Sequence, residues 1–128
     1  MTVSLIPQEV FDVVAQDASR LLAPSVELSG GRESLDTLWY RLTHDYFQLW
    51  MFFDEDNIPE GALVTSIEQH PLKKMLNLRF IGGDNLDGWH EELLETLERY
   101  ARENGCDGME TVGRFGWKKF LSKFGWEA

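Results

Sequence analysis

Three glycines and two aspartates lie close together in the segment at residues 82–88. Backbone N–H groups in a glycine-rich turn that opens a helix can hold a phosphate, because the helix dipole favours negative charge there. Gly82 and Gly83 alone are a weak signal for such a phosphate site, and Gly88 adds backbone freedom to the same segment. The alternative is that Asp84 or Asp87 caps the helix and occupies the place that an anion would take.

Glu68 and His70 are the two residues that we name as candidates for proton transfer. Carboxylates and imidazoles are common general bases, and both residues lie on or just after a predicted strand. Solvation of the strand edge is the alternative role for them. No metal site is expected, because the three histidines have no paired ligand spacing. The sequence also lacks a nucleophilic serine elbow, a Walker loop and a Cys/His pair at catalytic spacing.

A basic and aromatic cluster stands near the C-terminus of an otherwise acidic chain. Arginine and aromatic rings are enriched at protein interfaces, so the cluster is a candidate contact surface for a partner. The alternative is a solvated helix face whose aromatic rings belong to the core. The candidate partner-binding residues are Arg114, Trp117, Lys118, Lys119, Lys123 and Trp126.

The composition fits one domain spanning residues 1–128, with 43% hydrophobic residues to form a core. The net charge of −10 argues against direct binding to nucleic acid, because phosphate contacts need a basic surface. No apolar run is long enough for a membrane span, and residues 1–8 do not resemble a secretory signal. The single cysteine, Cys106, excludes an intramolecular disulfide. We expect a protein of the cytoplasm or of a particle assembled there.

The residue periodicity predicts an α/β domain, a mixed sheet with flanking helices. The first helix is predicted at Pro7–Leu22, with Pro24 ending it, and Ser34 can cap a short second helix. Strands at 46–53, 58–69 and 74–81 are expected to form an antiparallel meander. Alternation along the third strand places leucines 76 and 78 with Phe80 on one face, and Arg79 on the other.

The best-defined element is an amphipathic helix over about residues 86–103. Its apolar stripe predicts that Trp89 and Leu97 are buried against the sheet, and Gly105 is expected to end the helix in the left-handed conformation. A short strand at 107–112 follows. The strand, helix and strand form a βαβ-like crossover, which would make the two strands parallel neighbours. A last helix is predicted over 113–124.

This order of elements resembles the GNAT superfamily of N-acetyltransferases over about residues 49–127. The residues that carry the resemblance are Ala101, Arg102, Gly105 and Cys106, then Gly113, Arg114, Trp117, Gly125 and Trp126. The motifs LW at 49–50, ALVT at 62–65, PLKK at 71–74 and GRFGW at 113–117 are similar to a group of small GNAT-like proteins of tailed bacteriophages. The narrower resemblance implies phage or host proteins as partners, and the virion or the host cytoplasm as location.

Two departures from the family pattern concern the cofactor and the chemistry. In GNAT enzymes the turn before the long helix holds the pyrophosphate of acetyl-CoA and begins with Arg or Gln, which this chain lacks. The resemblance implies Gly82, Gly83 and Gly88 as the cofactor-binding residues if acetyl-CoA is bound. Asp84 and Asp87 would repel the phosphates, so we expect weak acetyl-CoA binding. The family's tyrosine, which protonates the CoA thiolate, corresponds to Leu121 here. In an enzyme, the C-terminal basic cluster could reach the 3′-phosphate of CoA.

Three functions remain open from the sequence. The two departures favour a non-catalytic GNAT-like phage protein, a structural or accessory component of the virion that needs no cofactor and acts through protein contacts. The alternative is an acetyl-CoA-dependent N-acetyltransferase with a divergent cofactor loop, in which Glu68 or His70 would be the base. A third hypothesis is an acidic inhibitor that mimics DNA against a host factor. The sequence does not predict the oligomeric state.

Overall fold

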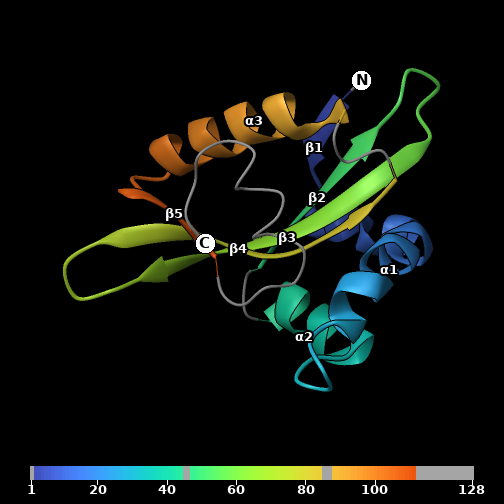
Figure 1. Ribbon diagram of the computed structural model, residues 1–128, viewed down its shortest axis with the longest axis horizontal. Coiled ribbons are helices and arrows are strands. Elements are labelled where there is room, and N and C mark those ends of the chain that lie inside the picture. The colour runs from blue at the N-terminus through green and yellow to red at the C-terminus, as the bar shows by residue number, and fades with distance from the viewer. Residues whose placement is uncertain (1, 45–46, 85–87, 112–128) are drawn as a thin grey trace.

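The computed structural model describes residues 2–44, 47–84 and 88–111. Within them, one sheet has the strand order β1 (Thr2–Leu5), β2 (Gln48–Phe53), β3 (Pro59–Gln69), β4 (Lys74–Gly83) and β5 (Gly108–Thr111). Neighbouring strands are antiparallel from β1 to β4, whereas β4 and β5 are parallel. The predicted meander and crossover are therefore confirmed (Figure 1).

Helices cover both faces of this sheet (Figure 1). On one face lie α1 (Phe11–Glu27), which follows a 3-10 turn at Gln8–Val10, and α2 (Leu35–His44). On the other face lies α3 (His90–Glu103), which connects β4 to β5. The predicted mixed α/β architecture is thus confirmed. No helix among the described residues is long and apolar enough to cross a membrane.

Two apolar clusters hold the layers together. The α1-side cluster joins α1 and α2 to the sheet, and its largest strand residues are Leu49, Met51, Val64 and Phe80. The α3-side cluster joins α3 to the opposite face through Trp50, Phe52, Leu63, Leu76, Leu78 and Ile81. Trp89 and Leu97 of the α3 region belong to this second cluster and are both 0% exposed, which confirms the predicted stripe.

The N-terminal elements differ from the prediction in two ways. β1 was not predicted, because a strand of only Thr2–Leu5 is defined by its pairing with distant residues, Trp50 to Phe53, and has no periodicity of its own. The prediction that Pro24 ends the first helix is wrong. α1 continues to Glu27, and Leu28 N–H donates to the Pro24 carbonyl at 3.2 Å. Burial of Val26 against the sheet offsets the backbone hydrogen bond that proline cannot make.

A β-bulge changes the faces of β4. Val64 pairs with Phe80 and the next residue, Thr65, pairs with Leu78, so Arg79 has no partner on β3. The expectation that Phe80 shares a face with Leu78 is therefore wrong: Phe80 joins the α1-side cluster and Leu78 the α3-side cluster. One extra residue in a strand reverses the side-chain alternation after it.

Candidate functional site

The bulge residue Arg79 is the centre of a polar cluster on the α2 side of the sheet. Its Nε donates to Ser66 Oγ at 2.8 Å, and its Nη2 donates to Glu68 Oε1 at 2.7 Å. The guanidinium carbon also lies 4.3 Å from the centre of the Phe47 ring, a cation–π contact. Because bulges re-aim side chains and are frequent beside active sites, this cluster is our candidate site.

The cluster borders a hollow of about 590 Å³, which we call the Arg79 cleft. Its lining comes from α2, the start of β2, β3 and β4, and consists of Arg41, Phe47, Gln48, Ser66, Ile67, Glu68 and Arg79. Arg41 faces the same Phe47 ring as Arg79, at 5.8 Å from its centre, and pairs with Glu33 at 3.5 Å. The cleft therefore offers charges of both signs, within the size range of small-ligand pockets.

Glu68, a predicted base, is held in its ionised form. Burial would raise the pKa of this carboxyl, but the hydrogen bonds from Arg79 and Ser66 and the charges of Arg79 and His70 outweigh it and lower the pKa. A carboxylate that is stabilised in this way is a weak proton acceptor. Glu68 is thus better suited to orienting Arg79 than to acting as the base.

His70, the other predicted base, has a carboxylate partner. Its Nε2 lies 2.8 Å from Oε1 of Glu110 on β5. Glu110 is opposite Asn77 in the β4–β5 register, and Asn77 is opposite Ser66 in the β3–β4 register. Asn77 is 2% exposed, and its Oδ1 accepts no hydrogen bond among the described residues. The pairing of His70 with Glu110 was not predicted, because it depends on β5 lying beside β4.

The glycines predicted to bind a cofactor have packing roles in the structure. A Cβ on Gly82 would lie 1.9 Å from the Leu21 carbonyl oxygen of α1. Gly83 has φ +147°, and a Cβ there would lie 2.3 Å from the Glu60 carbonyl oxygen of β3. Both glycines are therefore required by close backbone contacts, and their role in cofactor binding stays a prediction. Gly88 is exposed, and its role in cofactor binding also stays a prediction.

One feature of the α3 N-terminus suits a bound anion, namely the lack of a capping hydrogen bond from the N-cap side chain. The N-cap residue, Trp89, makes no side-chain capping hydrogen bond, and its indole N–H donates to Glu60 Oε2. The predicted cap by Asp84 is not seen among the described residues, and Asp87 lies outside them. The first-turn glutamates Glu91 and Glu92 complement the helix dipole instead.

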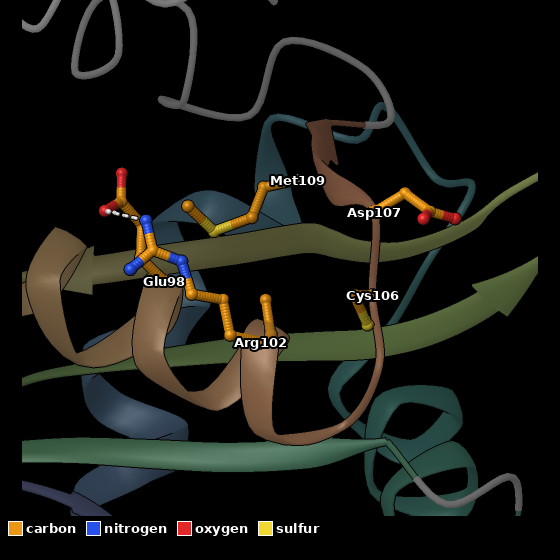
Figure 2. Close-up of a pocket in the computed structure, with 7 residues that line it drawn as sticks. Glu98, Arg102, Cys106, Asp107 and Met109 are labelled. Atoms are coloured by element: carbon orange, nitrogen blue, oxygen red, sulfur yellow. Dashed lines mark ion pairs between the residues drawn. The ribbon is translucent and has the colours of Figure 1, made fainter.

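A smaller hollow of about 190 Å³ lies between α3 and β5 (Figure 2). Glu98 and Arg102 of α3 form a 4.0 Å ion pair at its rim, with Met109 of β5 beside them. Burial raises the pKa of the Cys106 thiol, Asp107 adds to the rise, and Lys74 opposes it. A protonated thiol is a poor nucleophile, so this hollow provides no reactive group.

The predicted partner-binding cluster falls outside the described residues. Arg114, Trp117, Lys118, Lys119, Lys123 and Trp126 all follow Thr111, the last residue that the structure describes. Leu121, at the family's tyrosine position, lies there as well. The partner-binding cluster and the role of the Leu121 position therefore stay predictions from the sequence.

Comparisons with known proteins relate this geometry to solved structures. Neither a protein-family model nor a curated protein matches the sequence. The whole chain is similar to a probable acetyltransferase, with 17% identity, a TM-score of 0.71 and 91% of that chain covered. It is similarly related to a ribosomal-protein-alanine N-acetyltransferase from Brucella melitensis biovar Abortus 2308, with 14% identity, a TM-score of 0.69 and coverage of 100% of this chain and 94% of that one.

A GNAT family acetyltransferase from Staphylococcus aureus also matches, with 17% identity, a TM-score of 0.60 and coverage of 90% of this chain and 89% of that one. At such identities the likeness concerns the fold and not the activity. The phage proteins to which the short motifs are similar are not among these structures. The polar cleft at the β4 bulge therefore belongs to a chain that has the GNAT acetyltransferase fold.

Proposed function

We propose that the protein is an acyl-CoA-dependent N-acyltransferase. The observation that carries the proposal is the position of the Arg79 cleft at the bulge of β4, in a fold whose solved examples, cited above, are acetyltransferases. β4 and β5 are parallel, and ligands of open α/β sheets bind outside the carboxyl ends of such strands. The carboxyl end of β4 leads directly to the glycine segment and to α3.

The acyl-CoA would supply an activated acyl thioester. In this proposal the pyrophosphate is held at the α3 N-terminus, whose N-cap residue makes no side-chain capping bond but whose first turn carries Glu91 and Glu92. The glycine backbone fits less well, because Gly82 and Gly83 pack against α1 and β3. We therefore assign the phosphates to the N–H groups of the helix and not to a glycine cradle.

His70 is the proton acceptor in this proposal. When Nε2–H donates to Glu110, the lone pair of the imidazole remains on Nδ1, where it can take a proton from an amine. Glu110 fixes the ring orientation and stabilises the imidazolium that results, as carboxylates do in catalytic pairs. Glu68 holds Arg79 in the cleft and does not take the proton, because its pKa is lowered.

The test is calorimetric titration with acetyl-CoA, followed by thiol release in the presence of primary amines. We expect binding and turnover, with kcat falling by about 10²-fold or more in His70→Gln, as loss of a general base does. Glu68→Gln is the matched control. It leaves His70 as the base, so it should not show the same fall in kcat. Absence of both binding and turnover would refute the proposal.

The hypothesis of a non-catalytic virion component gains no support from the relatives described above. It rests on the altered cofactor loop, with Asp84 and Asp87, and on Leu121 in place of the family's tyrosine. Asp87, Leu121 and the basic cluster through which such a protein would act all lie outside the described residues. Reversal of Lys118, Lys119 and Lys123 to glutamate tests it, since a virion component should then fold but fail to assemble. The DNA-mimic hypothesis rests on the net charge of −10 alone.

A further inference from the structure

The edge of β3 is open at one end of the sheet. β2 pairs with β3 only as far as Gln48 opposite Thr65, whereas β3 continues to Gln69. Residues 66–69 therefore have β4 on one side and no described strand on the other. Figure 1 shows the corresponding β3–β4 hairpin extending beyond β2. Alternate backbone N–H and C=O groups of such an edge point outward without a strand to receive them.

This open edge lies in the Arg79 cleft. Ser66, Ile67 and Glu68 all border the cleft, so the hollow follows the strand. The side chain of Ile67 packs against the α3-side cluster on the opposite face. Ile67 therefore borders the cleft at the strand edge itself, through its backbone.

Within residues 66–69, the side chains that usually protect an edge strand are missing. Proteins guard such edges with lysine, proline or outward-pointing charges. Residues 66–69 contain neither lysine nor proline, and their single charge, Glu68, is neutralised by Arg79 at 2.7 Å. The β-bulge that could twist an edge away lies before this stretch, where Arg79 of β4 is opposite the step from Val64 to Thr65.

We propose that an extended polypeptide segment binds along residues 66–69 by adding a strand to β3. The inference rests on the proposed function and names its acceptor class, a polypeptide and not a small free amine. A stretch of this length spans about 13 Å, which four extended residues would fill. Backbone hydrogen bonds supply the affinity in this mode, and pockets for alternate side chains supply the specificity. Arg41 and Arg79 are the side chains placed to contact the bound segment.

The shape of the cleft favours one strand over a second copy of the protein. Arg41 of α2 and Phe47 form a wall of the hollow together with the β3 edge. The edge of another whole sheet would bring its own covering helices against α2, whereas a single extended segment would not. The occupant is therefore a segment and not a partner sheet.

The experiment uses the full chain and the peptide Ala-Thr-Val-Thr-Val-Lys amide, because recognition through the backbone tolerates many side chains. Two matched control peptides carry N-methyl groups at odd or at even positions, which removes the outward donors of one edge each. We expect the amide resonances of residues 66–69 to shift with the parent peptide and with one control only. Equal behaviour of all three peptides, or shifts elsewhere, would overturn the inference.

Two further outcomes are distinguishable. Protection of the 66–69 amides that rises with protein concentration in the absence of peptide would assign the edge to a second copy and overturn the inference. Acetylation of ethylamine without peptide binding would also overturn it, while the acyltransferase proposal would stand. Peptide binding at this edge, together with the absence of both acetyl-CoA binding and turnover, would sustain the inference about the surface and refute the acyltransferase.

Discussion

Replacement of Gly82 by alanine separates a packing role of this glycine from a cofactor role. The added Cβ would lie 1.9 Å from the Leu21 carbonyl oxygen and 2.9 Å from the carbonyl carbon, whereas ordinary contacts begin at 3.4 Å. Because the first contact is with backbone, α1 and β4 would have to separate by about 1.5 Å at this point. No side-chain rotation can relieve the contact.

The free-energy cost of the substitution depends on the buried side chains that this separation would expose. Leu21 and Leu22 of α1 are 3% and 1% exposed, and both belong to the α1-side cluster. Overpacking of a core typically costs about 1–3 kcal/mol, and a contact with backbone belongs at the upper end of that range. We expect a loss of about 3 kcal/mol, out of the roughly 5–15 kcal/mol that stabilise an ordinary domain.

Urea unfolding followed by tryptophan fluorescence measures the effect. A loss of this size lowers the urea midpoint by about 1–2 M when the slope is about 1.5–3 kcal/mol per M. Gly108→Ala is the matched control, because its Cβ would meet only the flexible side chain of Met75, with Cε at 3.3 Å and Sδ at 3.7 Å. A wild-type midpoint in Gly82→Ala, together with lost acetyl-CoA binding, would refute the packing argument and assign the glycine to the cofactor.

Four more perturbations test other parts of the structure. Leu97→Ala should cost about 2–5 kcal/mol in urea unfolding, because the side chain is 0% exposed. Asn77→Leu should raise the free energy of unfolding by about 1–3 kcal/mol, because it removes a buried acceptor that has no partner among the described residues. A lower melting temperature in this variant would contradict the expectation. Glu68 stabilises the fold while ionised, so its contribution is lost as the pH falls through its lowered folded pKa. Arg79→Leu should therefore reduce the loss of stability between neutral and acid pH. Asp84→Asn combined with Asp87→Asn should tighten acetyl-CoA binding a few-fold in calorimetry, and no gain would exclude charge repulsion as the cause of weak binding.

The sequence predicted those parts of the fold that depend on local pattern. The α3 stripe repeats at helical spacing on one face, so the burial of Trp89 and Leu97 followed from sequence alone. The left-handed end of that helix at Gly105, φ +71°, also follows from the residue type. The parallel placement of β4 and β5 followed from the length of the crossover between them.

The site depends on contacts between residues that are distant in sequence, and these had no local signal. Glu110 reaches His70 only because β5 pairs with β4. The strand edge at residues 66–69 exists because β2 begins late, at Gln48. The one available signal was Arg79 itself, an arginine that together with Asn77 interrupts the apolar run from Leu76 to Ile81.

The bulge links the packing of α1 to the geometry of the cleft. Without the extra residue at Arg79, strict alternation would place Phe80 and Gly82 on the α3 side, opposite to where they lie. The contact between Gly82 and Leu21 therefore requires the bulge, and α1 packed on Gly82 in turn opposes any return of β4 to regular pairing. Because Arg79 is itself the bulge residue and donates to Ser66 and Glu68, a change at Gly82 should disturb that hydrogen-bonded group without touching it. The Arg79 Nε–H resonance measures this: it should move in Gly82→Ala and stay in place in Gly108→Ala. If it is unchanged in both, the packing of α1 and the shape of the cleft are independent.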